Sequence, residues 1–151
     1  MREGYLSQDS FTFDQTEKGW RNLDNQGKYL EAAKLIEDYL KQNLKPINNQ
    51  HKVSVQTIHF HAGQEYAMAG KQYYPRAIEH FAQAQKGRPD WDLYVKGSIA
   101  FLQQDKNKLT ACAKELTKIA NRAAQHKPNA RLLQRFLKGL ESDSTYSEAY
   151  G

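Results

Sequence analysis

Histidines are the side chains in this sequence that most invite a chemical role, because imidazole binds metals and transfers protons near neutral pH. His59 and His61 flank Phe60, and His80 stands further along the chain. On a helix, residues two apart point about 200° away from each other, so His59 and His61 cannot share one metal ion. His61 and Glu65 would lie on one face, but no third ligand stands at a useful spacing. We therefore expect no metal site.

The single cysteine, Cys112, has no obvious catalytic partner. It belongs to an apolar stripe at helical spacing that runs from Leu109 to Ala123, so we predict a small buried side chain. One cysteine also excludes an intramolecular disulfide. The chain has no glycine-rich phosphate loop, no Gly-x-Ser-x-Gly elbow and no ordered Ser/His/Asp set. We expect neither an enzyme nor a cofactor.

The whole chain has a net charge of +5, and its basic residues are concentrated in the last third. Nine lysines and arginines lie between Lys106 and Lys138, and only Glu115 opposes them. Six of these, at helical spacing, define a predicted basic surface: Lys114, Lys118, Arg122, Arg131, Arg135 and Lys138. The favoured interpretation of these residues is a solvated charged face, and the second is a surface that binds an acidic protein. Nucleic acid ranks last, because no exposed aromatic residue is interleaved with these charges.

Helical periods, interrupted by glycine and proline, predict an all-α chain without strands. A first hairpin runs from about residue 13 to 43, and Lys45-Pro46 ends it. Residues 47–54 are predicted to form a surface loop. A second hairpin covers 53–87 and breaks at Gly70, and a third covers 91–124. Pro128 then introduces a seventh helix, which is expected to cover the last hairpin.

Small and aromatic residues recur through the second hairpin in the order Ala62, Gly63, Tyr66, Gly70, Ala77, Phe81, Ala84 and Pro89. Gly97 follows Gly63 by 34 residues. This pattern resembles the tetratricopeptide-repeat (TPR) family, or similar helical-hairpin repeats. The third hairpin keeps Gly97 but has Ala100 in the position of Tyr66. The first hairpin matches mainly at Gly27, Tyr29, Ala32 and Ile36.

The resemblance implies a right-handed α-solenoid of about three hairpins with a C-terminal capping helix. Residues 1–12 would form an N-terminal extension, 13–141 the repeats and 142–151 a tail. In such repeats the first helix of each hairpin lines a concave groove that binds a peptide or a helix. Alignment on Gly63 and Gly97 places these residues in that groove: Phe60, Gln64, Ala67, Met68, Tyr94, Ser98 and Phe101, with Arg21 and Asp24 as equivalents in the first hairpin.

We expect from this pattern a protein–protein interaction adaptor whose partner is a protein or peptide, possibly acidic. At least one of Phe60, Tyr94 and Phe101 should then be exposed. Two alternatives stay open: a secretion-type TPR chaperone, and a nucleic-acid-associated protein that uses the basic surface. No stretch approaches the roughly 18 apolar residues of a membrane span, and residues 1–10 contain no apolar core of a signal peptide. We expect no membrane contact and a cytoplasmic location.

Overall fold

The computed structural model describes residues 2–42 and 53–151. This part of the chain is all-helical and contains no strand. Its α-helices are α1 (Arg2–Leu6), α2 (Ser10–Gln15), α3 (Arg21–Asn25), α4 (Tyr29–Gln42), α5 (Val55–Ala69), α6 (Tyr74–Ala82), α7 (Pro89–Leu102), α8 (Lys106–Arg122), α9 (Lys127–Glu141) and α10 (Tyr146–Tyr150). Single 3-10 turns, Lys71–Tyr73 and Ala124–His126, precede α6 and α9. Most of the predicted loop at 47–54 falls outside the described residues.

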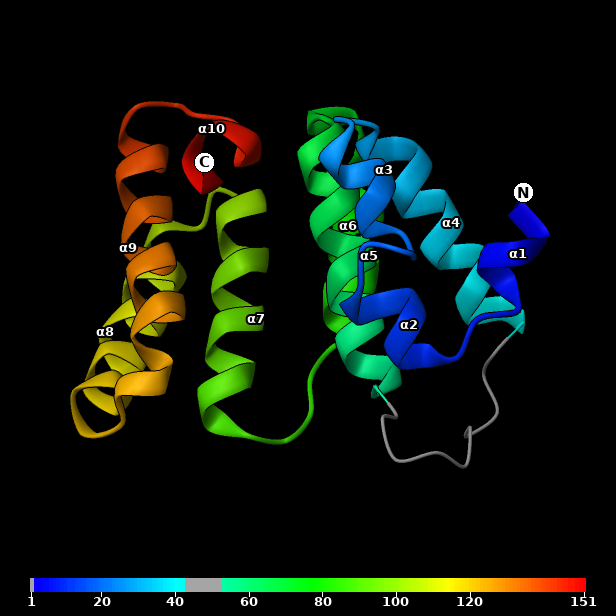
Figure 1. Ribbon diagram of the computed structural model, residues 1–151. Coiled ribbons are helices and arrows are strands. Elements are labelled where there is room, and N and C mark those ends of the chain that lie inside the picture. Colours follow the sequence, from blue (N-terminus) through cyan, green and yellow to red (C-terminus); the bar gives the residue numbers. More distant parts are fainter. Residues whose placement is uncertain (1, 43–52) are drawn as a thin grey trace.

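The long helices follow the chain order in space, and each packs against the next (Figure 1). Helix α5 contacts both α4 and α6, and α8 contacts both α7 and α9. Figure 1 shows α7, α8 and α9 on one side and α4, α5 and α6 on the other, with α10 near the upper ends of α7 and α9. The sequence predicted about seven helices, whereas the described part has ten. The additional ones are short helices at the two ends of the chain.

The first predicted hairpin is more broken than its sequence suggested. Its first arm divides into α2 and α3, and the chain between them folds back so that the Trp20 amide donates to the Phe13 carbonyl oxygen. A side chain on Gly19 would collide with the Phe13 backbone. This close approach of the two backbone segments requires glycine at position 19.

The hairpin of α5 and α6 forms where the sequence predicted it. Ser54 caps α5 by accepting a hydrogen bond from the Thr57 amide. Gly70, with φ 142°, ends α5 in a conformation that residues with a side chain rarely adopt, and Pro75 stands in the first turn of α6. A Cβ on Gly63 would lie 2.6 Å from Cδ1 of Phe81. Gly63 therefore lies at the tight interhelical contact that the pattern predicted.

The second glycine of the 34-residue pair packs differently. A Cβ on Gly97 would lie 2.6 Å from Cδ2 of Leu133, which belongs to α9 and not to the partner helix α8. The α7–α8 turn places Gln104 at φ 57° and uses the Asp105 side chain to cap α8. Cys112 is buried, as predicted, and burial raises the pKa of its thiol. Gly63 and Gly97 thus stand 34 residues apart but pack differently: Gly63 contacts the second helix of its own hairpin, and Gly97 contacts α9.

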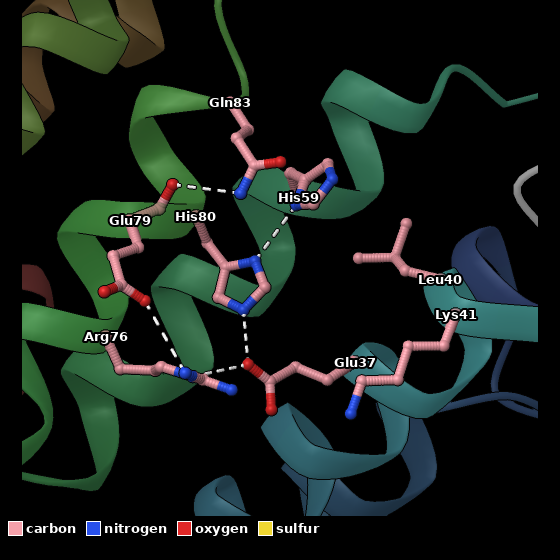
Figure 2. Close-up of a pocket in the computed structure, with 8 residues that line it drawn as sticks. All are labelled: Glu37, Leu40, Lys41, His59, Arg76, Glu79, His80 and Gln83. Atoms are coloured by element: carbon pink, nitrogen blue, oxygen red, sulfur yellow. Dashed lines mark hydrogen bonds and ion pairs between the residues drawn. The ribbon is translucent and has the colours of Figure 1, made fainter.

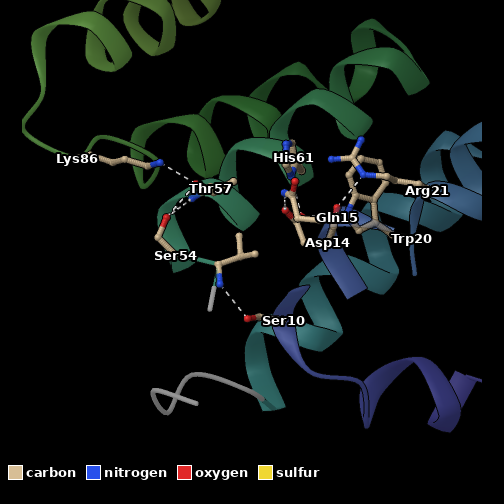
Figure 3. Close-up of polar contacts among 10 residues, drawn as sticks. Ser10, Asp14, Gln15, Trp20, Arg21, Ser54, Thr57, His61 and Lys86 are labelled. Atoms are coloured by element: carbon tan, nitrogen blue, oxygen red, sulfur yellow. Dashed lines mark hydrogen bonds and ion pairs between the residues drawn. The ribbon is translucent and has the colours of Figure 1, made fainter. Parts of the chain in front are cut away.

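Both terminal segments pack onto the helical body. Tyr39 donates from its hydroxyl to the Gln8 carbonyl oxygen at 2.7 Å. The Val53 amide donates to the Ser10 hydroxyl at 2.9 Å, which ties α2 to the start of α5 (Figure 3). The segment predicted as a tail contains α10, whose Tyr146 is fully buried. Within the described ranges, no helix has the length and apolar character needed to cross a bilayer.

Candidate functional site

A furrow runs between α4 and α6, with α5 beneath it. It consists of two adjoining hollows of about 290 Å³ and about 470 Å³. Both hollows are lined by Glu37 and Arg76, whose ion pair spans the furrow. Figure 2 shows the first hollow, in which α4 contributes Glu37, Leu40 and Lys41. The furrow is thus open to solvent on both sides of a central ion pair.

Glu37 is the centre of the polar network in this furrow. Its Oε2 accepts from Arg76 Nε and from His80 Nε2, each at 2.7 Å, and its Oε1 accepts from the Tyr66 hydroxyl at 2.6 Å. Burial alone would raise the pKa of Glu37, but hydrogen bonds from Arg76, Tyr66 and His80 outweigh it and lower the pKa to about 2. The carboxylate is therefore ionised at neutral pH and held by three donors.

The network continues from His80 to His59, whose Nδ1 atoms lie 3.0 Å apart (Figure 2). Since the ionised Glu37 accepts, His80 Nε2 carries a hydrogen; in a neutral His80 ring, Nδ1 then accepts from His59. This leaves His59 Nε2 as the nitrogen without a proton. Burial is the largest cause that lowers the pKa of His59, to about 4. His59 therefore presents a neutral hydrogen-bond acceptor at the furrow.

The furrow presents groups that can form hydrogen bonds and apolar contacts with a ligand. No group of three or more His, Cys, Asp or Glu side chains in the described residues is placed to hold a metal ion. Arg76 keeps half of its side chain exposed, and Lys41, Glu79 and Gln83 form an exposed polar rim. Leu30 and Tyr73 add apolar surface in the second hollow. The furrow thus offers donors, acceptors and apolar contact on a fixed frame.

A second polar network lies at the other face of α5 and has a structural role. Asp14 is fully buried, and its Oδ1 accepts from Trp20 Nε1 at 3.0 Å and from His61 Nδ1 at 2.7 Å (Figure 3). Burial would raise the pKa of Asp14, but the bond to His61 and the further hydrogen bonds lower it below its usual value. His61 therefore ties α5 to α2, while His59 bonds to α6. The predicted separation of these two histidines is confirmed.

The groove residues predicted from the repeat alignment do not form an open surface. Phe60, Tyr94 and Phe101 are 2%, 4% and 2% exposed, and Ser98 is fully buried. The expectation that one of the three aromatic residues would be exposed is wrong. Side chains of α6 and α7 cover the Phe60 ring, and α9 and α10 cover that of Phe101.

Three of the other predicted groove residues are less enclosed. Gln64, Met68 and Arg21 are all partly buried. Arg21 donates from Nε to the Asp14 carbonyl oxygen at 2.7 Å and stacks its guanidinium over the Trp20 ring. Arg21 is therefore held in contacts with Asp14 and Trp20.

All six residues of the predicted basic surface are exposed, on α8 and α9. Leu109, Cys112 and Leu116 occupy the buried side of α8, as expected. Lys118 Nζ lies 3.3 Å from the Glu115 carboxylate, and Arg135 donates to the Tyr150 carbonyl oxygen at 3.1 Å. Arg135 of α9 therefore also contacts the C-terminal helix.

The sequence reasoning missed the furrow, although part of its signal was local. Arg76, Glu79 and Gln83 recur at helical spacing and predict a polar face on α6. Nothing local pairs Glu37 with Arg76, since 39 residues separate them. Comparison with protein-family models, with curated proteins and with solved structures found no match for this chain.

Proposed function

We propose that this protein is an interaction adaptor that binds a segment of a partner protein in the furrow between α4 and α6. The observation that carries the proposal is the pair of adjoining open hollows that meet at Glu37 and Arg76. Protein segments present alternating backbone donors and acceptors together with side chains of mixed polarity. The furrow offers matching groups along both walls, and its centre is already ordered, which lowers the entropic cost of binding.

The architecture that supports this function is a right-handed solenoid of TPR-like hairpins capped by α9. Three features favour it: consecutive helices pack as neighbours, Gly63 lies at a tight crossing inside its hairpin, and α9 covers the third hairpin. The furrow then lies between the second helices of two successive hairpins. Binding would use this outer side of the solenoid in place of the concave side, whose aromatic residues are buried.

Differential capture from the native host tests the proposal. The full-length protein and a furrow variant, Lys41→Glu with Gln83→Arg, would be compared as bait. Both positions are exposed and lie at the first hollow, so the changes should spare folding. Charge reversal at Lys114 and Arg131, two exposed residues of the basic surface, provides a matched control. We expect a protein that wild type and control both retain and the furrow variant loses.

The captured protein would then be purified and titrated calorimetrically against all three baits. A loss of affinity of at least tenfold in the furrow variant alone supports the proposal. Equal binding by the wild-type protein and the furrow variant would refute the placement of the site. Loss in the basic-surface control alone would assign the partner to α8 and α9.

A further inference from the structure

Helix α10 packs against α9 and α5, and side chains of α6 and α7 also reach it. We call this surface the α10 seat and define it by Gln64, Tyr74, Phe101, Phe136 and Gly139. The Tyr146 ring lies 5.3 Å from the Phe136 ring and 6.2 Å from the Phe101 ring, centre to centre. The backbone amide of Tyr146 donates to the Tyr74 hydroxyl at 2.8 Å. A short helix thus fills an aromatic site with one buried ring.

Gly139 gives the α10 seat a notch of defined size. A Cβ on Gly139 would lie 2.8 Å from Cβ of Ala149 and 3.2 Å from Cε1 of Phe101. Glycine in a helix interior is otherwise unfavourable, and here it leaves room for a single methyl group. The seat therefore selects a small side chain three residues after the aromatic one.

The fit of Tyr146 in the seat is incomplete at its hydroxyl. The ring is fully buried, yet nowhere in the described ranges does this hydroxyl find a hydrogen-bond partner, although the Gln64 amide lies nearby. Burying a hydroxyl without a partner is costly. A phenylalanine in this place would keep the ring contacts and remove that cost.

Helix α10 also has little stability of its own. It spans five residues, and isolated helices of fewer than about 12 residues are marginal in water. Its capping box, in which the Thr145 and Glu148 side chains each bond the other's backbone, orders only its first turn. Contacts with the seat therefore keep α10 in place, and a helix with better contacts would replace it.

We propose that the α10 seat is a second docking surface, whose partner is a helix with an aromatic residue and a small residue three positions later. In the free protein, Tyr146 and Ala149 supply this pattern from within the chain. The partner's aromatic residue fills the place of Tyr146 between Phe101 and Phe136. This surface is separate from the furrow and does not depend on it.

The test uses the full-length chain with Ala149→Leu, because a leucine cannot enter the Gly139 notch and should release α10 while the seat keeps its sequence. The probe is a fluorescein-labelled peptide of residues 143–151, titrated by fluorescence anisotropy. We expect saturable binding to Ala149→Leu, at least tenfold weaker binding to wild type, and about five- to tenfold tighter binding of the Tyr146→Phe peptide. Ser147→Leu, at a partly exposed position, is the matched control and should behave as wild type.

A second pair of variants keeps the proposal testable if Ala149→Leu disturbs folding, as judged by circular dichroism. Gly139→Ala should release α10, and Gly139→Ala with Ala149→Gly should retain it. The Gly139→Ala protein should bind the peptide with glycine at position 149 at least tenfold more tightly than the native peptide. Failure of a folded variant to bind either peptide would overturn the proposal. Self-association of wild type that the peptide reverses would assign the seat to a second copy and also overturn it.

Discussion

Replacing Glu37 by glutamine should remove a large part of the acid sensitivity of this fold. The pKa of Glu37 falls from 4.5 to about 2 in the folded protein. A carboxylate whose pKa is lower in the folded protein than in the unfolded chain stabilises the fold at pH values above its pKa in the unfolded chain. This contribution is lost as the pH falls through the pKa that the group has in the folded protein. A shift of this size corresponds to about 3 kcal/mol, of which about 2 kcal/mol should be lost by pH 3.

Glutamine has nearly the shape of glutamate but cannot satisfy the same three donors. It offers one acceptor oxygen, and its amide N–H groups would face Arg76 or His80. The Glu37 side chain is only 12% exposed, so water compensates for little of the loss. We expect Glu37→Gln to lower the free energy of unfolding at pH 7 by on the order of 1–3 kcal/mol.

Urea unfolding followed by circular dichroism at pH 7, 5, 4 and 3 would measure the effect. The difference in unfolding free energy between wild type and Glu37→Gln should narrow steadily from pH 5 to pH 3. Glu79→Gln is the matched control, because Glu79 faces the same Arg76 at 3.6 Å but is 66% exposed. It should stay within about 0.5 kcal/mol of wild type. A Glu37→Gln difference that is constant across this range would refute the assigned ionisation.

Three further substitutions test other parts of the structure. Burial raises the pKa of Glu65 to about 9, so this side chain must take up a proton when the protein folds at pH 7. Glutamine removes that cost, and Glu65→Gln should therefore raise the midpoint of urea unfolding at pH 7 but not at pH 4. The pKa of His59 is lowered to about 4 in the folded protein, so the fold loses stability as the pH falls from about 6.5 towards 4. His59→Asn should make the free energy of unfolding less dependent on pH in that range. Gly63→Leu should overpack its helix crossing and cost on the order of 1–3 kcal/mol in thermal unfolding; an unchanged midpoint would contradict the crossing.

The sequence by itself determined the features that depend on neighbouring residues. Helical periods, Gly70 and Pro75 defined the α5–α6 hairpin, and the i and i+2 spacing of His59 and His61 placed their side chains on different faces. The apolar stripe around Cys112 likewise predicted which side of α8 is buried. These properties follow from helix geometry and backbone conformation, which act within a few residues of the chain.

Only the tertiary structure decided which distant residues meet. Glu37, Tyr66, Arg76 and His80 come from three helices, and their network exists because α4 and α6 flank α5 at a fixed distance. The burial of Phe101 similarly depends on α9 and on a five-residue helix at the far end of the chain. A helical period states that one face is apolar, but it does not state what covers that face. Long-range packing selects the covering element, and here it closed the predicted groove and opened a furrow elsewhere.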